Sequence, residues 1–141
     1  MSYLTNAIRL AALAHADQVD KSGVAYILHP LRVMLSPTLT TEAERIVAVL
    51  HDVKEDHPEQ WADWERYFVD VPGVLDGIDG ITWRKGESWK AYLRRAKENP
   101  IARKVKLADL NDNLRPIPNP TKVDERRRQK YVDAALFLSR V

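Results

Sequence analysis

The sequence lacks several features that would assign the protein to a well-defined class. It contains no cysteine, which excludes a disulfide framework and metal sites built from thiolates. No apolar run approaches the roughly 20 residues needed to cross a bilayer. The N-terminal MSYLTNAIRL has neither the basic start nor the long apolar stretch of a signal peptide. These absences predict a soluble, cytoplasmic protein that has no membrane partner.

The sequence also lacks an excess of charge of one sign. Its 22 basic and 20 acidic residues give a formal net charge of +2, which is too balanced to argue for a nucleic-acid partner. A basic cluster, Arg126–Arg128 with Lys130, directly follows Asp124 and Glu125. We therefore interpret this cluster as a solvated helix face and predict no nucleic-acid binding.

Glycine is also scarce, with 5 residues, and apolar residues recur at three- and four-residue spacing, which predicts mainly helices. The length of 141 residues suits one domain with one core. We therefore expect an all-α, compact single-domain helical bundle over residues 1–141. Thr41 and Glu44 predict a capping box, and the aromatic residues between 61 and 68 are expected in the core. The predicted helices span residues 3–17, 30–35, 41–57, 59–69, 71–80, 87–98, 100–114 and 121–139, with loops at 82–86 and 115–120.

The hexapeptide HDVKED, residues 51–56, places one histidine and three carboxylates at the end of an apolar helix. On a continuous helix, residues four apart share a face, so His51 would lie over Glu55 and Asp52 over Asp56. Adjacent anions at the negative end of a helix are unfavourable unless a cation or a shared proton relieves them. Charge placed against local preference indicates function, and a divalent metal would relieve the repulsion. The alternative is a helix end that meets water.

Two further residues could complete a metal site. His29 precedes a proline at a predicted helix start, where its backbone is rigidly held. Asp109 lies in VKLADLNDN, where its spacing places it on one side of a helix with Lys106 and Asn113. A carboxylate in such an apolar stretch needs either a partner or a metal. Each histidine taken alone is more often structural, as we expect for His15 on its apolar helix face.

Four segments of the sequence resemble a known family. AHADQVDKSGVAYILHP (14–30) is similar to AH-x-x-Q-x-R-K-S-G-x-P-Y-I-x-HP, VLHDVKED (49–56) to LLHDxxED, and KLADLNDNL (106–114) to KLADxxxNL. DGIDGITWRKG (76–86) is similar to a stretch with G-x-T ahead of a loop. These patterns are those of the HD-domain phosphohydrolases, and the sequence most closely resembles the hydrolase domain of RelA/SpoT homologues and the small stand-alone alarmone hydrolases. The resemblance covers nearly the whole chain and implies an HD-domain helical bundle.

The resemblance also implies a site with one divalent metal, usually manganese. The implied ligands are His29, His51, Asp52 and Asp109. Manganese, iron and zinc all suit two nitrogen and two carboxylate donors. Glu55 and Asp56 would then activate or orient the attacking water. The residues predicted to bind the nucleotide or its phosphates are Lys21, Ser22, Tyr26, Thr82, Arg84, Lys85, Lys106 and Asn113.

The implied substrate is guanosine tetra- or pentaphosphate, from which the family removes the 3′-pyrophosphate. The sequence has Asp20 where the family often has an arginine that stacks on the guanine base, and an aspartate would instead repel phosphate. Ala25, His57 and the segment 110–112 also depart from the family pattern. Two alternatives therefore stay open: a phosphohydrolase acting on another nucleotide, and a non-catalytic nucleotide-binding protein of the same fold. The intact Glu55–Asp56 pair argues against the second alternative. No oligomeric state is implied.

Overall fold

The computed structural model describes all residues, 1–141, and is entirely helical apart from an isolated bridge between Val19 and Ala25. The prediction of an all-α single-domain bundle is thus confirmed. The elements are α1 (Tyr3–Ala14), α2 (Leu28–Met34), α3 (Glu42–Leu50), α4 (Val53–Asp56), α5 (Pro58–Trp64), the 3-10 helix η1 (Glu65–Phe68), α6 (Val74–Ile81), α7 (Trp89–Glu98), α8 (Pro100–Asn113) and α9 (Lys122–Ser139).

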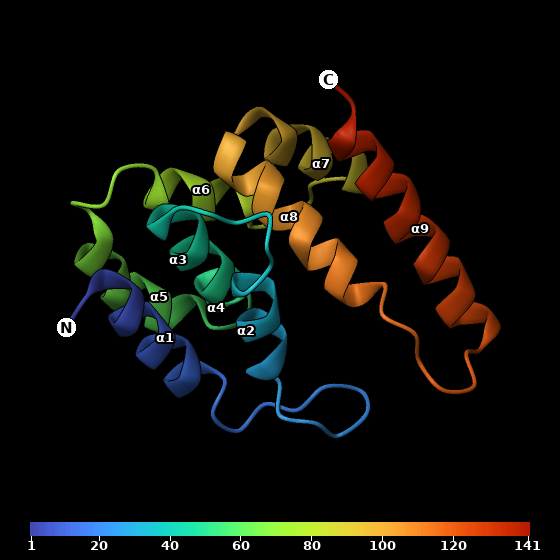
Figure 1. Ribbon diagram of the computed structural model, residues 1–141, viewed down its shortest axis with the longest axis horizontal. Coiled ribbons are helices and arrows are strands. Elements are labelled where there is room, and N and C mark those ends of the chain that lie inside the picture. The colour runs from blue at the N-terminus through green and yellow to red at the C-terminus, as the bar shows by residue number, and fades with distance from the viewer.

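Helices α3 and α8 form the centre of the bundle (Figure 1). Helix α3 packs against α1, α2, α6 and α8, and α8 also packs against α2, α6, α7 and α9. The main core contains 21 buried residues, among them Ile46, Val47 and Leu50 of α3. Helix α9 runs along the outside of α7 and α8 (Figure 1), where a separate cluster of 5 buried residues attaches it. The site described below lies where α2, the end of α3 and α8 meet.

Local sequence signals explain several helix ends. Thr41 accepts a hydrogen bond from the Glu44 amide, and Glu44 accepts one from the Thr41 amide, so the predicted capping box is confirmed. Glu44 is buried and also accepts a hydrogen bond from Lys104 of α8 at 3.0 Å. Asn99 caps α8 by accepting from two amides, and the proline at the first position of that helix needs no acceptor. These caps fix the ends of both central helices.

The predicted helix over residues 41–57 is wrong in one respect, because it is interrupted at His51 and Asp52. The His51 ring Nδ1–H donates to the Ala48 carbonyl at 2.5 Å, and the His51 amide reaches the same carbonyl at 3.5 Å. A continuous helix would give that carbonyl to the amide of Asp52. The short helix α4 begins at Val53, so His51 and Glu55 are not on one continuous helix and the predicted placement of His51 over Glu55 is wrong.

Other predicted boundaries shift by a few residues. Helix α1 ends at Ala14 rather than at residue 17, and α2 begins two residues before Pro30, which occupies the third helical position and needs no hydrogen-bond acceptor there. The stretch 59–69 divides into α5 and η1. Its aromatic residues are only partly core: Trp61 and Phe68 are buried, whereas Tyr67 is 42% exposed.

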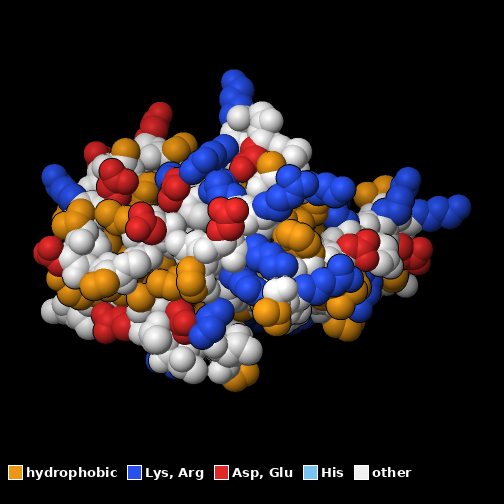
Figure 2. All heavy atoms as spheres, turned by 90° about the horizontal axis from the view of Figure 1, so that it is seen from above, with side chains coloured by type: hydrophobic (Ala, Val, Ile, Leu, Met, Phe, Trp, Pro, Cys, Tyr) orange, Lys and Arg blue, Asp and Glu red, His pale blue; other side chains and the backbone are white.

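Charge is unevenly distributed over the surface. Figure 2 shows Lys and Arg side chains gathered over the half of the molecule that α7, α8 and α9 occupy. Acidic side chains are more frequent over the other half of this face (Figure 2). None of the helices combines the length and the apolar composition required to cross a membrane.

We expect Leu50→Ala to destabilise the protein by about 2–5 kcal/mol, because the substitution leaves a cavity in the main core. Leu50 has 0% exposure, whereas Leu136 of α9 is 53% exposed. Leu136→Ala is therefore the matched control and should change the free energy of unfolding by less than about 1 kcal/mol. Urea denaturation followed by circular dichroism measures both values. Equal losses in the two variants would contradict this account of the core.

Candidate metal and catalytic site

The four predicted metal ligands meet between α2, the turn after α3, and α8. His29 Nε2 lies 2.8 Å from Asp109 Oδ1, and His51 Nε2 lies 3.2 Å from the same oxygen. Asp52 Oδ2 lies 3.2 Å from His51 Nε2 and 3.7 Å from His29 Nε2. The ligand atoms of His29, His51 and Asp52 all fall within 4.8 Å of one another. This spacing could hold a metal ion, and we call these four residues the His/Asp cluster.

Both imidazoles of the His/Asp cluster direct Nε2 inward because Nδ1 is engaged elsewhere. His51 Nδ1 lies on the Ala48 carbonyl, and His29 Nδ1 lies 2.7 Å from Asp112 Oδ2. Metal-binding histidines commonly have the second ring nitrogen fixed by such an oxygen. The arrangement therefore fits a cation held by two Nε2 atoms and two carboxylates.

The electrostatics of the His/Asp cluster also favour a cation. Burial lowers the pKa of His51, but Asp52 and Asp109 outweigh burial and raise that pKa to about 9. Burial likewise opposes protonation of His29, and its hydrogen bonds to carboxylates raise its pKa above the ordinary value. Burial tends to raise the pKa of Asp109, whereas Lys106 and the two imidazoles hold it well below its usual range. The carboxylates thus attract protons to both rings, and a divalent cation would satisfy the same oxygens.

The two predicted catalytic carboxylates turn to different neighbours. Glu55 Oε1 accepts a hydrogen bond from the Trp83 amide at 2.8 Å, in the loop after α6. Burial, followed by the charge of Asp52, raises the pKa of Glu55 despite that hydrogen bond. Asp56 Oδ2 accepts from Gln18 Nε2 at 3.3 Å. Each carboxylate therefore accepts a hydrogen bond from its own donor, which stabilises its negative charge without a shared proton.

Gln18 connects Asp56 to two histidines. Its Oε1 lies 2.8 Å from His15 Nδ1 and 3.0 Å from His57 Nε2. If both rings donate to this oxygen, the side-chain NH₂ of Gln18 is directed at Asp56. His15 is buried, as expected, and packs between the Tyr26 and His57 rings.

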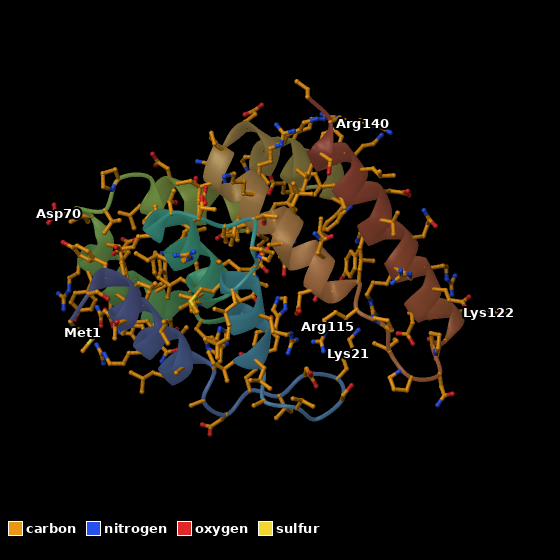
Figure 3. All side chains as sticks on the ribbon, in the orientation of Figure 1. Met1, Lys21, Asp70, Arg115, Lys122 and Arg140 are labelled. Carbon is orange, nitrogen blue, oxygen red and sulfur yellow. The ribbon has the colours of Figure 1, made fainter.

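A basic cleft of about 740 Å³ opens beside the His/Asp cluster. The predicted substrate residues Lys21, Ser22 and Asn113 line it. Asn113 Nδ2 lies 3.3 Å from Asp109 Oδ1, so the cleft and the His/Asp cluster share a wall. Figure 3 labels Lys21, from the loop after α1, and Arg115, from the turn after α8, and both residues line this cleft. The cations that line the cleft are Lys21, Arg115, Arg127 and Arg128.

Comparisons with known proteins identify the family. No family model matches the sequence. The chain is 31% identical over 135 residues to the guanosine-3′,5′-bis(diphosphate) 3′-pyrophosphohydrolase MESH1 of Drosophila melanogaster. The aligned region covers 88% of this chain and 75% of MESH1. The chain belongs to the HD-domain family of alarmone hydrolases. The resemblance predicted from the sequence motifs is thus confirmed.

Two larger relatives are matched over a smaller part of their length. The bifunctional (p)ppGpp synthase/hydrolase SpoT of Escherichia coli K12 is 29% identical over 136 residues, which are 89% of this chain and 19% of SpoT. A GTP pyrophosphokinase of Streptomyces antibioticus is 33% identical over 123 residues, which are 79% of this chain and 14% of that protein. The alarmone-hydrolase family therefore includes both small proteins and much longer chains that contain a region similar to this one.

Three residues predicted to bind substrate lie elsewhere in this alarmone-hydrolase fold. The Tyr26 hydroxyl donates to Asp52 Oδ2 at 2.5 Å. Lys106 donates to Asp109 Oδ2 at 2.8 Å and lies against the Trp89 and Tyr92 rings. These two residues donate hydrogen bonds to carboxylates of the His/Asp cluster. Thr82 is buried and its hydroxyl donates to the carbonyl of Ile78, so its contact with phosphate stays a prediction.

The remaining loop residues and Asp20 occupy distinct positions. Arg84 pairs with Asp79 at 3.0 Å, and Lys85 is exposed. The Asp20 carboxylate accepts the amides of Ser22 and Val24, at 2.8 and 3.0 Å, within its own loop. It therefore shapes the loop that presents Lys21 and Ser22.

Sequence reasoning missed several residues of the site. Asp112, which holds His29, was noted only as a departure from the family pattern. Its three-residue spacing from Asp109 places both carboxylates toward one side of α8, and that spacing was an available signal. Arg127 and Arg128 belong to the basic cluster for which the sequence favours a solvated helix face, and both also line the cleft. Their partner surface comes from distant segments, so no local pattern reveals it.

Arg95 binds the loop after α6, whose Trp83 amide donates to Glu55. Arg95 donates to the carbonyls of Asp79 and Thr82, both at 2.6 Å, and to the carboxylate of Glu87 at 2.8 and 2.9 Å. Hydrogen bonding to Arg95 lowers the pKa of Glu87 from 4.5 to about 2. A lowered pKa means that this pair contributes stability above pH 4.5, which is lost as the pH falls toward 2.

We predict that Glu87→Gln is less stable than the wild type at neutral pH and that this difference shrinks as the pH falls from 4.5 toward 2. The measurement is urea denaturation at a series of pH values from about 6 downward. Glu98→Gln, an exposed residue in α7, is the control and should show no such trend. A Glu87→Gln difference that stays constant with pH would contradict the assignment.

Proposed function

We propose that residues 1–141 form one cytoplasmic, HD-type metal-dependent phosphohydrolase domain that removes the 3′-pyrophosphate from guanosine tetra- or pentaphosphate. The observation that carries this proposal is the convergence of His29, His51, Asp52 and Asp109 beside a basic cleft. The relative that this chain covers over 75% of its length is named for this reaction alone. The names of two much longer relatives, SpoT of Escherichia coli and the GTP pyrophosphokinase of Streptomyces antibioticus, include a synthetic activity, and this proposal does not extend to it.

The proposed metal is manganese, or another divalent ion, held by the His/Asp cluster. When bound, it supplies Lewis-acid chemistry that stabilises phosphate charge and makes water more acidic. The protein's own contribution is to hold the donor atoms in place. Tyr26 donates to Asp52 and Lys106 donates to Asp109, so each ligand carboxylate is oriented before the ion arrives.

Glu55 is the proposed general base and Asp56 orients the water. Desolvation raises the pKa of the Glu55 carboxylate, which makes it a stronger acceptor for a proton. The water oxygen forms a bond to the phosphorus attached to the 3′-oxygen and gives one proton to the carboxylate. The bond between that phosphorus and the 3′-oxygen breaks, and the leaving oxygen takes up a proton. The products are pyrophosphate and guanosine di- or triphosphate.

The basic cleft is the proposed site for the rest of the nucleotide. Four cations face two carboxylates, Asp124 and Glu125, among its lining residues. Asp124 is already engaged by the Thr121 amide and hydroxyl, and lies 3.5 Å from Arg127. The cations therefore dominate the cleft and suit the phosphates of the substrate. Because Asp20 replaces the family's stacking arginine, a second candidate substrate is a different nucleotide with a similar phosphate group.

The test uses the purified full chain with Mn²⁺ and a panel of nucleotides that includes guanosine tetraphosphate, with products separated by ion-exchange chromatography. Pyrophosphate release from the alarmone supports the proposed reaction. Release only from other nucleotides supports the second candidate. Nucleotide binding without turnover, unchanged in Asp52→Ala, would instead indicate a non-catalytic binding protein.

For the catalytic carboxylate, Glu55→Gln should lower kcat by about 10²–10⁴-fold, because the amide cannot accept the proton of the attacking water. Mn²⁺ binding should be retained, whereas His51→Ala should fail to load the metal. Glu59→Gln removes an exposed carboxylate four residues away and is the matched control. A Glu55→Gln kcat within tenfold of the wild type would rule out this role for Glu55.

For the cleft, Arg127→Ala should raise KM about tenfold with little change in kcat, because a hydrogen bond to a charged group contributes about 1.5 kcal/mol or more. Arg126 is the neighbouring residue on α9 and does not line the cleft. Arg126→Ala is therefore the control and should keep the KM of the wild type. Equal KM values for the two variants would show that this wall of the cleft does not bind substrate.

A further inference from the structure

The Asp112 carboxylate forms hydrogen bonds with two side chains of helix α2. His29 Nδ1 lies 2.7 Å from Asp112 Oδ2. Arg32 holds the same carboxylate with two parallel hydrogen bonds, from Nε at 2.7 Å and from Nη2 at 3.0 Å. The Asp112 side chain is only 9% exposed. A bidentate guanidinium–carboxylate pair has a fixed geometry, so Arg32 determines where the oxygen that meets His29 lies.

The position of this carboxylate determines which nitrogen of His29 faces the His/Asp cluster. An oxygen on Nδ1 fixes a hydrogen atom there and turns Nε2 toward Asp52 and Asp109, where its lone pair would bind a metal once Nε2 is deprotonated. An anionic acceptor also makes the opposite nitrogen more basic, which strengthens a bond to a metal. His51 achieves the same orientation with a backbone carbonyl, so only His29 depends on a side chain for it.

We propose that Asp112, held by Arg32, is a positioning residue that orients His29 and thereby sets the metal affinity of the His/Asp cluster. The inference rests on the proposed function, because it assumes that His29 is a ligand. The competing explanation is that the three residues only join α2 to α8. Arg115 Nη1 lies 3.8 Å from Asp112 Oδ1, so its contribution is weaker than that of Arg32.

The test is calorimetric titration of the metal-free, full-length protein with Mn²⁺. Asp112→Asn should weaken binding by about 10–100-fold, which is the usual effect of losing a partner of a metal ligand. Arg32→Gln should weaken it in the same direction but less. The control is Asp133→Asn, which removes an exposed carboxylate that only Gln129 contacts, and should bind Mn²⁺ within about twofold of the wild type.

The double variant shows whether Arg32 acts through Asp112. If it does, adding Arg32→Gln to Asp112→Asn should weaken Mn²⁺ binding by less than about twofold further, since the pair acts as one unit. Excess Mn²⁺ should restore pyrophosphate release in Asp112→Asn but not in Glu55→Gln. Fully additive losses in the double variant would overturn the positioning role.

Urea denaturation of the metal-free variants separates positioning from simple joining of the helices. Variants that lose stability but bind Mn²⁺ as tightly as the wild type overturn the inference. If Asp112→Asn does not fold, Arg32→Gln is used for the test instead. An unchanged Mn²⁺ affinity in Arg32→Gln then overturns the inference. If the wild type binds no Mn²⁺, the proposed function fails as well. If it binds and turns over substrate while Asp112→Asn binds equally well, only this inference fails.

Discussion

The buried carboxylate of Asp109 contacts side chains from α2, the end of α3 and α8, so one group links helix packing to the candidate site. Its Oδ1 lies within hydrogen-bonding distance of His29, His51 and Asn113, and its Oδ2 accepts from Lys106. A buried charge is strongly unfavourable unless several partners surround it, so α2, the end of α3 and α8 must pack in one relative arrangement to satisfy it. The same arrangement brings the four candidate ligands together, which means that folding and assembly of the site are one event.

The sequence predicted the fold best where the signals are local. The capping box at Thr41 and the prolines near helix starts are short stretches of sequence, and the structure has the corresponding features. The break at His51 was missed because it arises when a side chain takes the carbonyl of Ala48, a choice that helical periodicity does not encode. The pairing of His29 with Asp112 spans 83 positions, so no local pattern could reveal it.

The predicted substrate residues divide according to distance from the ligands. Lys21 and Ser22 line the cleft, whereas Tyr26 and Lys106 donate to carboxylates of the His/Asp cluster. A sequence motif identifies residues near the site. The length and orientation of each side chain decide whether it contacts the cleft or the His/Asp cluster. Asp20 illustrates the same point, because its carboxylate binds its own loop. Its position explains a structural role for the aspartate and leaves the choice of nucleotide to experiment.

The attachment of α9 has a consequence for the cleft. This helix supplies Arg127 and Arg128 to the lining, yet it is fastened to α7 and α8 through a cluster of only 5 buried residues, whereas the main core contains 21. Segments with few buried apolar contacts open locally at a lower free energy than the whole molecule unfolds. Local opening of α9 is therefore expected at a lower free energy than opening of the main core, and it would widen the cleft while the His/Asp cluster stays assembled.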